Sequence, residues 1–89
     1  MEKFENIYIK DSVFLQEVDS ETILLDSETE EYFSLDEIGA IFYQMLKEEP
    51  NFKKAATELA EHFKTDEKII EMDLANFVKN LMDKKLLNV

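Results

Sequence analysis

The stretch that decides the fold is "EEYFSLDEIG", residues 30–39, in which two carboxylates and two aromatic residues precede a helix-start signal. If Ser34 is the N-cap, Glu37 stands at the third helical position and completes an S-x-x-E capping box. Phe33 and Ile38 then occupy the two positions of a hydrophobic staple. Both signals predict that a short strand over 31–34 ends where a helix begins at Ser34.

A single apolar stripe continues this predicted helix, and its members recur at helical spacing: Ile38, Ile41, Phe42, Met45 and Leu46. The helix ends before Pro50, because the residue that precedes a proline avoids the α region. Gly39 is the only glycine of the chain and falls inside this helix, where glycine costs about 0.5–1 kcal/mol relative to alanine. We therefore interpret Gly39 as a close-approach position where the helix packs against the rest of the fold.

Two strand-like runs come before this stretch, "SVFLQEV" over 12–18 and "ETILLD" over 21–26. They are rich in β-branched and aliphatic residues, and Asp19-Ser20 between them is typical of a tight hairpin turn. Residues 27–30, "SETE", form a second predicted turn. With the strand over 31–34, these runs predict a three-stranded antiparallel meander.

Two further helices complete the predicted fold. Asn51 caps the second helix, and Thr65 or Asp66 caps the third. The buried stripe of the third helix is Ile70, Leu74, Phe77, Val78 and Leu81, after which Leu86-Leu87 fold back as a tail. The sequence thus predicts one domain over residues 1–89, of the α+β class and winged-helix-like, with three strands followed by three helices.

The composition of the chain limits the classes of partner that it can bind. The chain has 89 residues, no Cys, and 21 acidic residues against 10 basic ones, all Lys, for a net charge of −11. The negative electrostatic field of such a protein repels the phosphate backbone of nucleic acids. Arg, the side chain best suited to contact phosphate and guanine, is absent. We therefore expect no nucleic-acid partner. A neutral or basic peptide is compatible. With no signal peptide or long apolar run in the sequence, we expect a cytoplasmic protein with no membrane partner.

Catalytic chemistry has little support in the sequence. The single histidine, His62, has Glu58 and Asp66 four residues to either side, but one His among abundant surface acids is a weak metal site. We interpret His62 as a surface residue and expect no metal, no cofactor and no catalytic residues. Carboxylate pairs in turns and at helix ends are solvated, whereas general acid–base work needs a carboxyl with a raised pKa in a dry pocket.

Two surface features remain as binding candidates. The third strand is a sheet edge, which its charges either protect against aggregation or leave open to an extended peptide that adds as a strand. Beside its apolar stripe, the third helix carries a polar ridge of Asp73, Asn76 and Asn80 next to Ile69 and Phe77. This ridge is either a solvated face or one wall of a peptide groove.

Three runs taken together resemble the PqqD family of RiPP recognition elements: "VDSETILLDSETEEYFSLDEIGAIFYQML" (18–46), "FKKAATELAEHF" (52–63) and "TDEKIIEMDLANFVKNLMDKKLL" (65–87). The resemblance implies a peptide chaperone without catalytic activity. Such proteins bind the leader region of a ribosomally made precursor peptide along the third strand, in a cleft walled by the third helix. They deliver it to a tailoring enzyme, either a radical-SAM maturase or the leader peptidase of a lasso-peptide system.

Carried onto this sequence, the resemblance implies a peptide-binding site made of Glu31, Tyr32, Phe33, Ser34, Ile69, Asp73, Asn76, Phe77 and Asn80. Glu30 and Lys85 stand where the family usually has glycine. We expect a monomer, with a weak dimer through the open strand edge as the alternative. The alternative function is a winged-helix-derived regulatory or structural subunit that acts through protein–protein contacts. Adjacent residues of a strand face opposite sides of a sheet, and the sequence does not say which side of the third strand faces the groove. Either Tyr32 or Phe33 therefore faces it.

Overall fold

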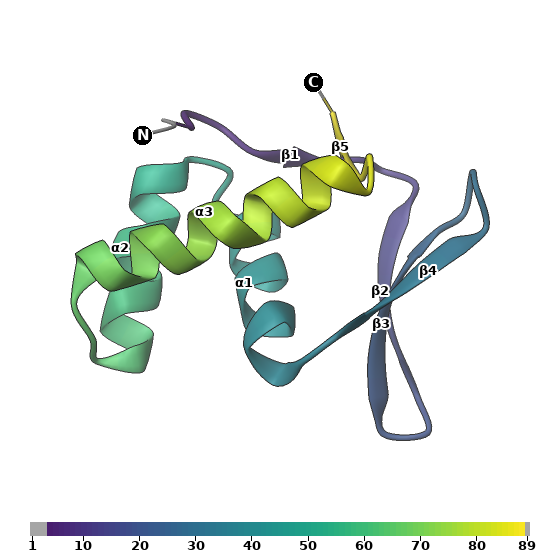
Figure 1. Cartoon of the computed structure of the whole chain (residues 1–89), viewed down its shortest axis with the longest axis horizontal. Coiled ribbons are helices and arrows are strands. Elements are labelled where there is room, and N and C mark those ends of the chain that lie inside the picture. The colour runs from purple at the N-terminus through teal and green to yellow at the C-terminus, as the bar shows by residue number, and fades with distance from the viewer. Residues whose placement is uncertain (1–3, 89) are drawn as a thin grey trace.

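Three antiparallel strands of one sheet precede three helices in the computed structural model, which describes residues 4–88. Figure 1 shows the sheet on one side of the molecule and the helices on the other, with α3 passing in front of α1. The predicted α+β fold is confirmed, and a short strand near each terminus is added. In chain order the elements are β1 (Tyr8–Ile9), β2 (Val13–Val18), β3 (Glu21–Asp26), β4 (Glu31–Leu35), α1 (Glu37–Glu48), α2 (Phe52–Phe63), α3 (Glu67–Asp83) and β5 (Leu87–Asn88).

The main sheet is a meander of order β2-β3-β4, with antiparallel pairing on both sides of β3. β3 has the predicted bounds, β2 begins one residue later than predicted, and β4 runs one residue further, to Leu35. Asp19 and Ser20 join β2 to β3, with φ angles of 49° and 71°. Two left-handed central residues match the twist of the paired strands, and the predicted hairpin turn is confirmed.

The turn that leads into β4 is organised by Asp26, which is only 2% exposed. Its carboxylate accepts a hydrogen bond from the Glu28 backbone N–H at 2.9 Å, and its carbonyl accepts one from the Glu30 N–H at 2.7 Å. The Glu28 hydrogen bond holds the pKa of Asp26 below its usual value. Because the negative charge is bound in place by backbone donors, this turn fixes the point where β4 begins.

Helix α1 begins two residues later than predicted, so the proposed capping box and hydrophobic staple are wrong. Ser34 stays in the sheet, opposite Ile23 of β3, and the N-cap is Asp36, whose carboxylate accepts from the Gly39 N–H at 2.6 Å. The strand ladder keeps the backbone extended past Ser34, and aspartate is an equally good cap. Ile38, predicted on the buried stripe, is 54% exposed as a result.

Gly39 is buried and lies where three side chains approach the start of α1. A Cβ at this position would lie 3.0 Å from Asp36 Oδ1, 3.4 Å from Leu35 Cδ2 and 3.5 Å from Phe77 Cε1. The prediction of a close-approach position is confirmed. The tightest neighbour is the cap carboxylate itself, so the glycine leaves room for the hydrogen bond that ends the strand and begins the helix.

The other two helices begin at the predicted caps. Asn51 accepts from the Lys54 N–H at 3.0 Å, and Asp66, rather than Thr65, accepts from the Lys68 N–H at 2.7 Å.

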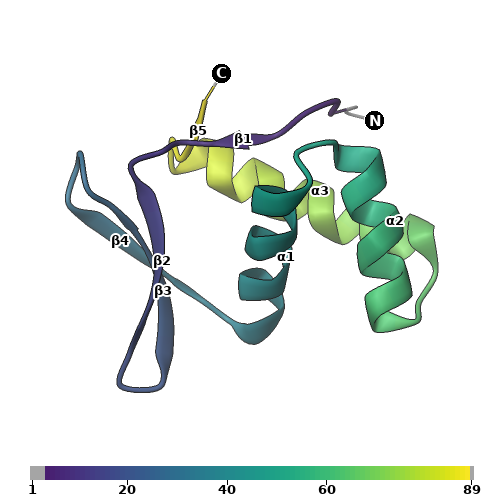
Figure 2. The ribbon, with the colours of Figure 1, turned by 180° about the vertical axis from the view of Figure 1, so that it is seen from behind.

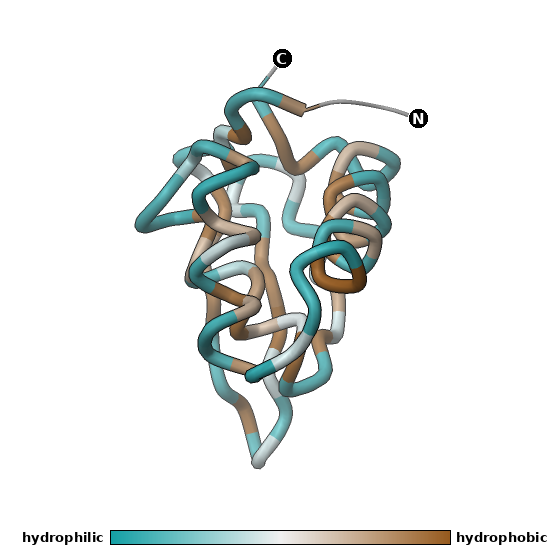
Figure 3. The backbone as a smooth tube through the Cα atoms, turned by 90° about the vertical axis from the view of Figure 1, so that its left-hand side faces the viewer, coloured by the Kyte–Doolittle hydropathy of each residue, from teal (hydrophilic) through white to brown (hydrophobic). Residues whose placement is uncertain are grey.

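Figure 3 shows apolar and polar segments alternating along the helices, as expected where one side of each helix is buried. Within residues 4–88, no helix combines the length and the apolar character that crossing a membrane requires. The largest fully buried apolar side chains come from the three helices, the main sheet and the segment that follows α3: Val13, Leu24, Leu46, Leu59, Leu74, Val78 and Leu86.

The two ends of the described chain lie side by side. β1 pairs with β5 in an antiparallel ladder that matches Ile9 with Leu87, and Figure 2 shows the two strands together above α1 and α3. Leu86 and Leu87 are both buried, which confirms that they fold back after the last helix. β1 was not expected from the sequence, because a strand of two residues gives almost no periodic signal.

Candidate functional site

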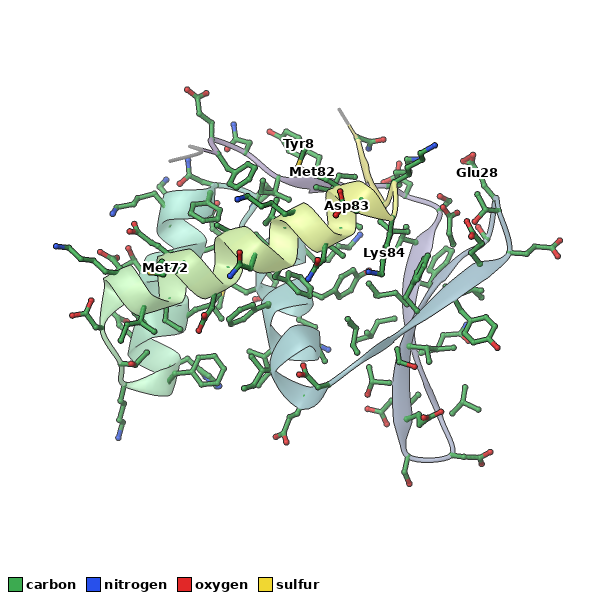
Figure 4. The ribbon with its side chains drawn as sticks, viewed as in Figure 1. Tyr8, Glu28, Met72, Met82, Asp83 and Lys84 are labelled. Atoms are coloured by element: carbon green, nitrogen blue, oxygen red, sulfur yellow. The ribbon has the colours of Figure 1, made fainter. Side chains whose placement is uncertain are left out.

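β4 is an edge of the sheet, because it pairs with β3 on one side and no described strand pairs with its other side. It runs diagonally from the turn that contains Glu28 to the start of α1 (Figures 1 and 4). An unpaired edge presents a row of backbone N–H and C=O groups that can pair with another strand. β2 is the other edge of the same sheet.

The pairing register settles the parity of β4. Phe33 lies opposite Leu24, which is fully buried, and Leu35 lies opposite Thr22 on the same face. Both Phe33 and Leu35 are half-buried and pack against the core beneath the helices. Phe33, and not Tyr32, therefore lies on the face that is turned toward the helices.

Tyr32 and Ser34 project from the opposite face of the sheet. Tyr32 is 68% exposed and lies opposite Leu25, which in turn lies opposite Phe14 of β2. Phe14 is itself 50% exposed. The outer face of the sheet thus carries an aromatic–aliphatic–aromatic row, and its side chains do not contribute to a groove on the helix side.

Two contacts place α3 beside β4. The Lys84 ammonium lies 5.5 Å from the centroid of the Phe33 ring. At the other end of the strand, the Phe77 ring reaches the space next to Gly39 that Leu35 also borders. The end of α3 thus approaches β4 at two points, with Phe33 near Lys84, just past the helix, and Leu35 near Phe77, about two turns earlier.

Phe77 serves both the core and this surface. Its ring packs edge-on against Phe42, with the two centroids 5.7 Å apart, and it stays half-buried. Phe42, by contrast, is 3% exposed and also contacts Phe63. A substitution of Phe77 would therefore disturb core packing as well as the surface beside β4.

The polar ridge of α3 is exposed, as expected: Asp73, Asn76 and Asn80 all face solvent. Ile69 is 54% exposed, but it lies eight residues before Phe77, about 12 Å along the helix axis at 1.5 Å per residue. The structure thus places Phe77 close to Leu35 of β4 and sets Ile69 well apart from Phe77 along α3. Two further residues belong to this surface and were not expected from the sequence: Leu35, the last residue of β4, and Lys84, which lies over Phe33.

A shallow pocket of about 480 Å³ lies between the start of α1, the end of β4 and the β2–β3 hairpin. Its walls are apolar at Leu15, Leu35 and Ile41, and acidic side chains border it. His62 is exposed on α2, as expected, and its ring stands edge-on to Phe63. Within residues 4–88, no group of His, Cys, Asp or Glu side chains is placed to hold a metal ion.

The family model described as "Coenzyme PQQ synthesis protein D (PqqD)" matches residues 21–87, which include the whole β3-to-α3 segment. The chain belongs to the PqqD family. No protein with a curated description matches it.

Two solved structures share this PqqD-family fold. One, described as TbiB1 in complex with the TbiA(beta) leader peptide, is 30% identical in sequence, with a TM-score of 0.77 over 91% of this chain and 94% of that one. The other, described as lasso peptide synthetase B1 complexed with the leader peptide, is 20% identical, with a TM-score of 0.78 over 94% of this chain and 99% of that one. The second likeness concerns the fold alone.

The resemblance to the PqqD family seen in the sequence is thus confirmed, and its two departures acquire a structural meaning. Glu30 and Lys85 both adopt left-handed backbone conformations, with φ angles of 64° and 59°. Glycine takes this conformation without strain, whereas a side chain makes it unfavourable. This PqqD-family chain therefore builds both turns from residues with side chains, in a conformation that favours glycine.

Proposed function

We propose that this protein is a non-catalytic peptide chaperone, which binds the leader region of a ribosomally made precursor peptide as an added strand along β4. It then presents the precursor to a tailoring enzyme, either a radical-SAM maturase or a leader peptidase. The observation that carries this proposal is an unpaired β4 edge flanked by α3, in a PqqD-family chain 30% identical to a protein solved with a leader peptide.

The local chemistry suits an extended peptide. The backbone of β4 supplies affinity with little demand on sequence, while side-chain pockets beside it supply selectivity. Phe33 and Phe77 offer half-buried aromatic surface on the helix side, and Asp73, Asn76 and Asn80 offer carboxylate and amide groups along α3. β2 is the other edge of the sheet, but the carbonyl of its Val13 already accepts a hydrogen bond from the Tyr43 hydroxyl of α1 at 3.4 Å.

The charge of the protein favours a binding partner with a basic surface. The net charge of −11 favours approach of a surface with positive charge, either on the leader or on the enzyme. Electrostatic steering of this kind acts mainly on the association rate and weakens with added salt.

A pair of matched substitutions tests the site. Phe33→Ala removes an aromatic side chain beside the β4 edge, and Phe14→Ala removes one from β2 on the opposite face. With the leader segment of the cognate precursor as ligand, Phe33→Ala should weaken binding by roughly tenfold, as expected for an aromatic anchor. Phe14→Ala should leave the dissociation constant unchanged. Equal effects of both substitutions would argue against the β4 site.

A further inference from the structure

We propose that the ammonium group of Lys84 binds an acidic side chain of the leader peptide, next to the apolar peptide residue that packs on Phe33. This assignment rests on the proposed function, because it states what the peptide must carry at the β4 edge. It adds a requirement that strand addition alone does not impose, since backbone pairing accepts most sequences.

Lys84 is held at both ends. Its backbone is the C-cap of α3 and donates to the carbonyls of Asn80 and Met82, and its ammonium lies over the Phe33 ring at 5.5 Å from the centroid. In Figure 4 its side chain descends from the end of α3 on the side of β4, whereas Asp83 points away on the opposite side. The charge is therefore placed at the strand edge rather than spread through solvent.

Among the residues that the structure describes, the ammonium has no carboxylate partner. Although the chain holds 21 acidic residues, none of those between residues 4 and 88 lies within 4.0 Å of the Lys84 Nζ atom. Glu31 shares the helix-side face of β4 with Phe33 and still makes no ion pair with Lys84. A cation over an aromatic ring at an exposed site is held weakly enough for an incoming carboxylate to pair with it.

Strand geometry says which peptide residues are in reach. A strand added to β4 lies about 4.7–4.9 Å away, and its side chains alternate between the two faces of the sheet. The residue beside Phe33 and the residue two positions along the peptide both lie on the helix side, in direct and diagonal contact distance. We therefore expect an apolar residue and a carboxylate two positions apart in the leader, with the carboxylate at Lys84.

The negative charge of the rest of the molecule makes a preference for an acidic peptide residue easy to detect. A protein with a net charge of −11 generally favours basic peptides, so an acidic preference at one position would come from a local cation. Lys85 is the matched control, because it is the next residue, is exposed and bears the same charge. Lys84→Glu and Lys85→Glu change the net charge equally.

A displayed library of random peptides is the probe. Selection on the unmodified protein should enrich peptides with an apolar residue and an Asp or Glu two positions apart. Lys84→Glu should replace that carboxylate with Lys or Arg, while Lys85→Glu keeps the original preference. The affinity of an acid-bearing peptide should fall roughly fivefold for Lys84→Glu, the scale of an exposed ion pair. Lys84→Met, which keeps an apolar stem over the ring, should lose the acidic preference and still bind.

The outcomes separate the two proposals. If the enriched peptides shift the amide signals of β4 but are unchanged by Lys84→Glu, the role of Lys84 is overturned and strand addition stands. If they shift neither β4 nor α3, both proposals fail. A switch in charge preference with Lys85→Glu as large as with Lys84→Glu would show a long-range field effect and would also overturn the assignment to Lys84.

Discussion

The Gly39 N–H donates to Asp36 Oδ1 at 2.6 Å, and this hydrogen bond marks where β4 stops and α1 starts. Since Ser34 and Leu35 remain paired with β3, the cap leaves a strand of five residues. Leu35, the last of these, borders the space beside Gly39 and Phe77. The length of the proposed binding edge and its position against α3 thus depend on the same cap.

Asp36→Ala should lower the free energy of unfolding by about 0.5–2 kcal/mol, because it removes the N-cap of α1. Ser34→Ala is the matched control: Ser34 is exposed and lies in the strand, so its loss should change stability by no more than about 0.5 kcal/mol. Chemical denaturation of both variants measures the difference. A larger loss for Ser34→Ala would restore Ser34 as the cap and contradict the observed helix start.

Much of this fold follows from the sequence, because its signals are local. The 21–26 strand, the Asp19-Ser20 turn and the Asn51 cap each depend on residues next to one another in the chain. The start of α1 was misplaced for a physical reason. Ser34 and Asp36 are both competent caps, and what excludes Ser34 is its pairing with Ile23 in the sheet, a tertiary contact that no local pattern records.

The candidate site was less predictable. Tyr32 and Phe33 are adjacent aromatics, so their alternation cannot say which one faces the helices; the register opposite Leu24 decides it. Lys84 did carry a faint signal, because it continues the helical spacing of Phe77 and Asn80. That spacing shows a shared face of α3, but only the contact with Phe33 shows that this face meets β4.

Glu30→Gly and Lys85→Gly should each raise the free energy of unfolding, by roughly 1 kcal/mol. Both residues have φ near +60°, which costs a residue with a side chain about 1–2 kcal/mol and costs glycine little. Glu28→Gly is the control, because Glu28 has no positive φ and should be destabilised by the added freedom of the unfolded chain. If all three substitutions destabilise, strain at these two turns does not limit stability.

The turn before β4 should be sensitive to acid. The Glu28 N–H lowers the pKa of Asp26 from its ordinary value of 3.8, so the ionised form stabilises the folded state above that value. This contribution is lost as pH falls below about 3.8 and through the folded pKa. The Asp26→Asn variant lacks this stabilisation by the ionised carboxylate. The difference in free energy of unfolding between it and the original protein should therefore be largest at neutral pH and should shrink in acid. Denaturation across pH measures this gap, and a gap that widens in acid would contradict the assignment.

The central claim is that a leader peptide adds as a strand at β4 beside α3. Amide spectra of the isotope-labelled protein, recorded as the leader segment of its precursor is added, test it most directly. We predict that the largest changes fall on residues 31–35 and on residues 73–84, which span the second half of α3 and its C-cap, while the other edge, β2, stays unchanged. Changes concentrated on β2 or α2, with β4 undisturbed, would contradict the claim.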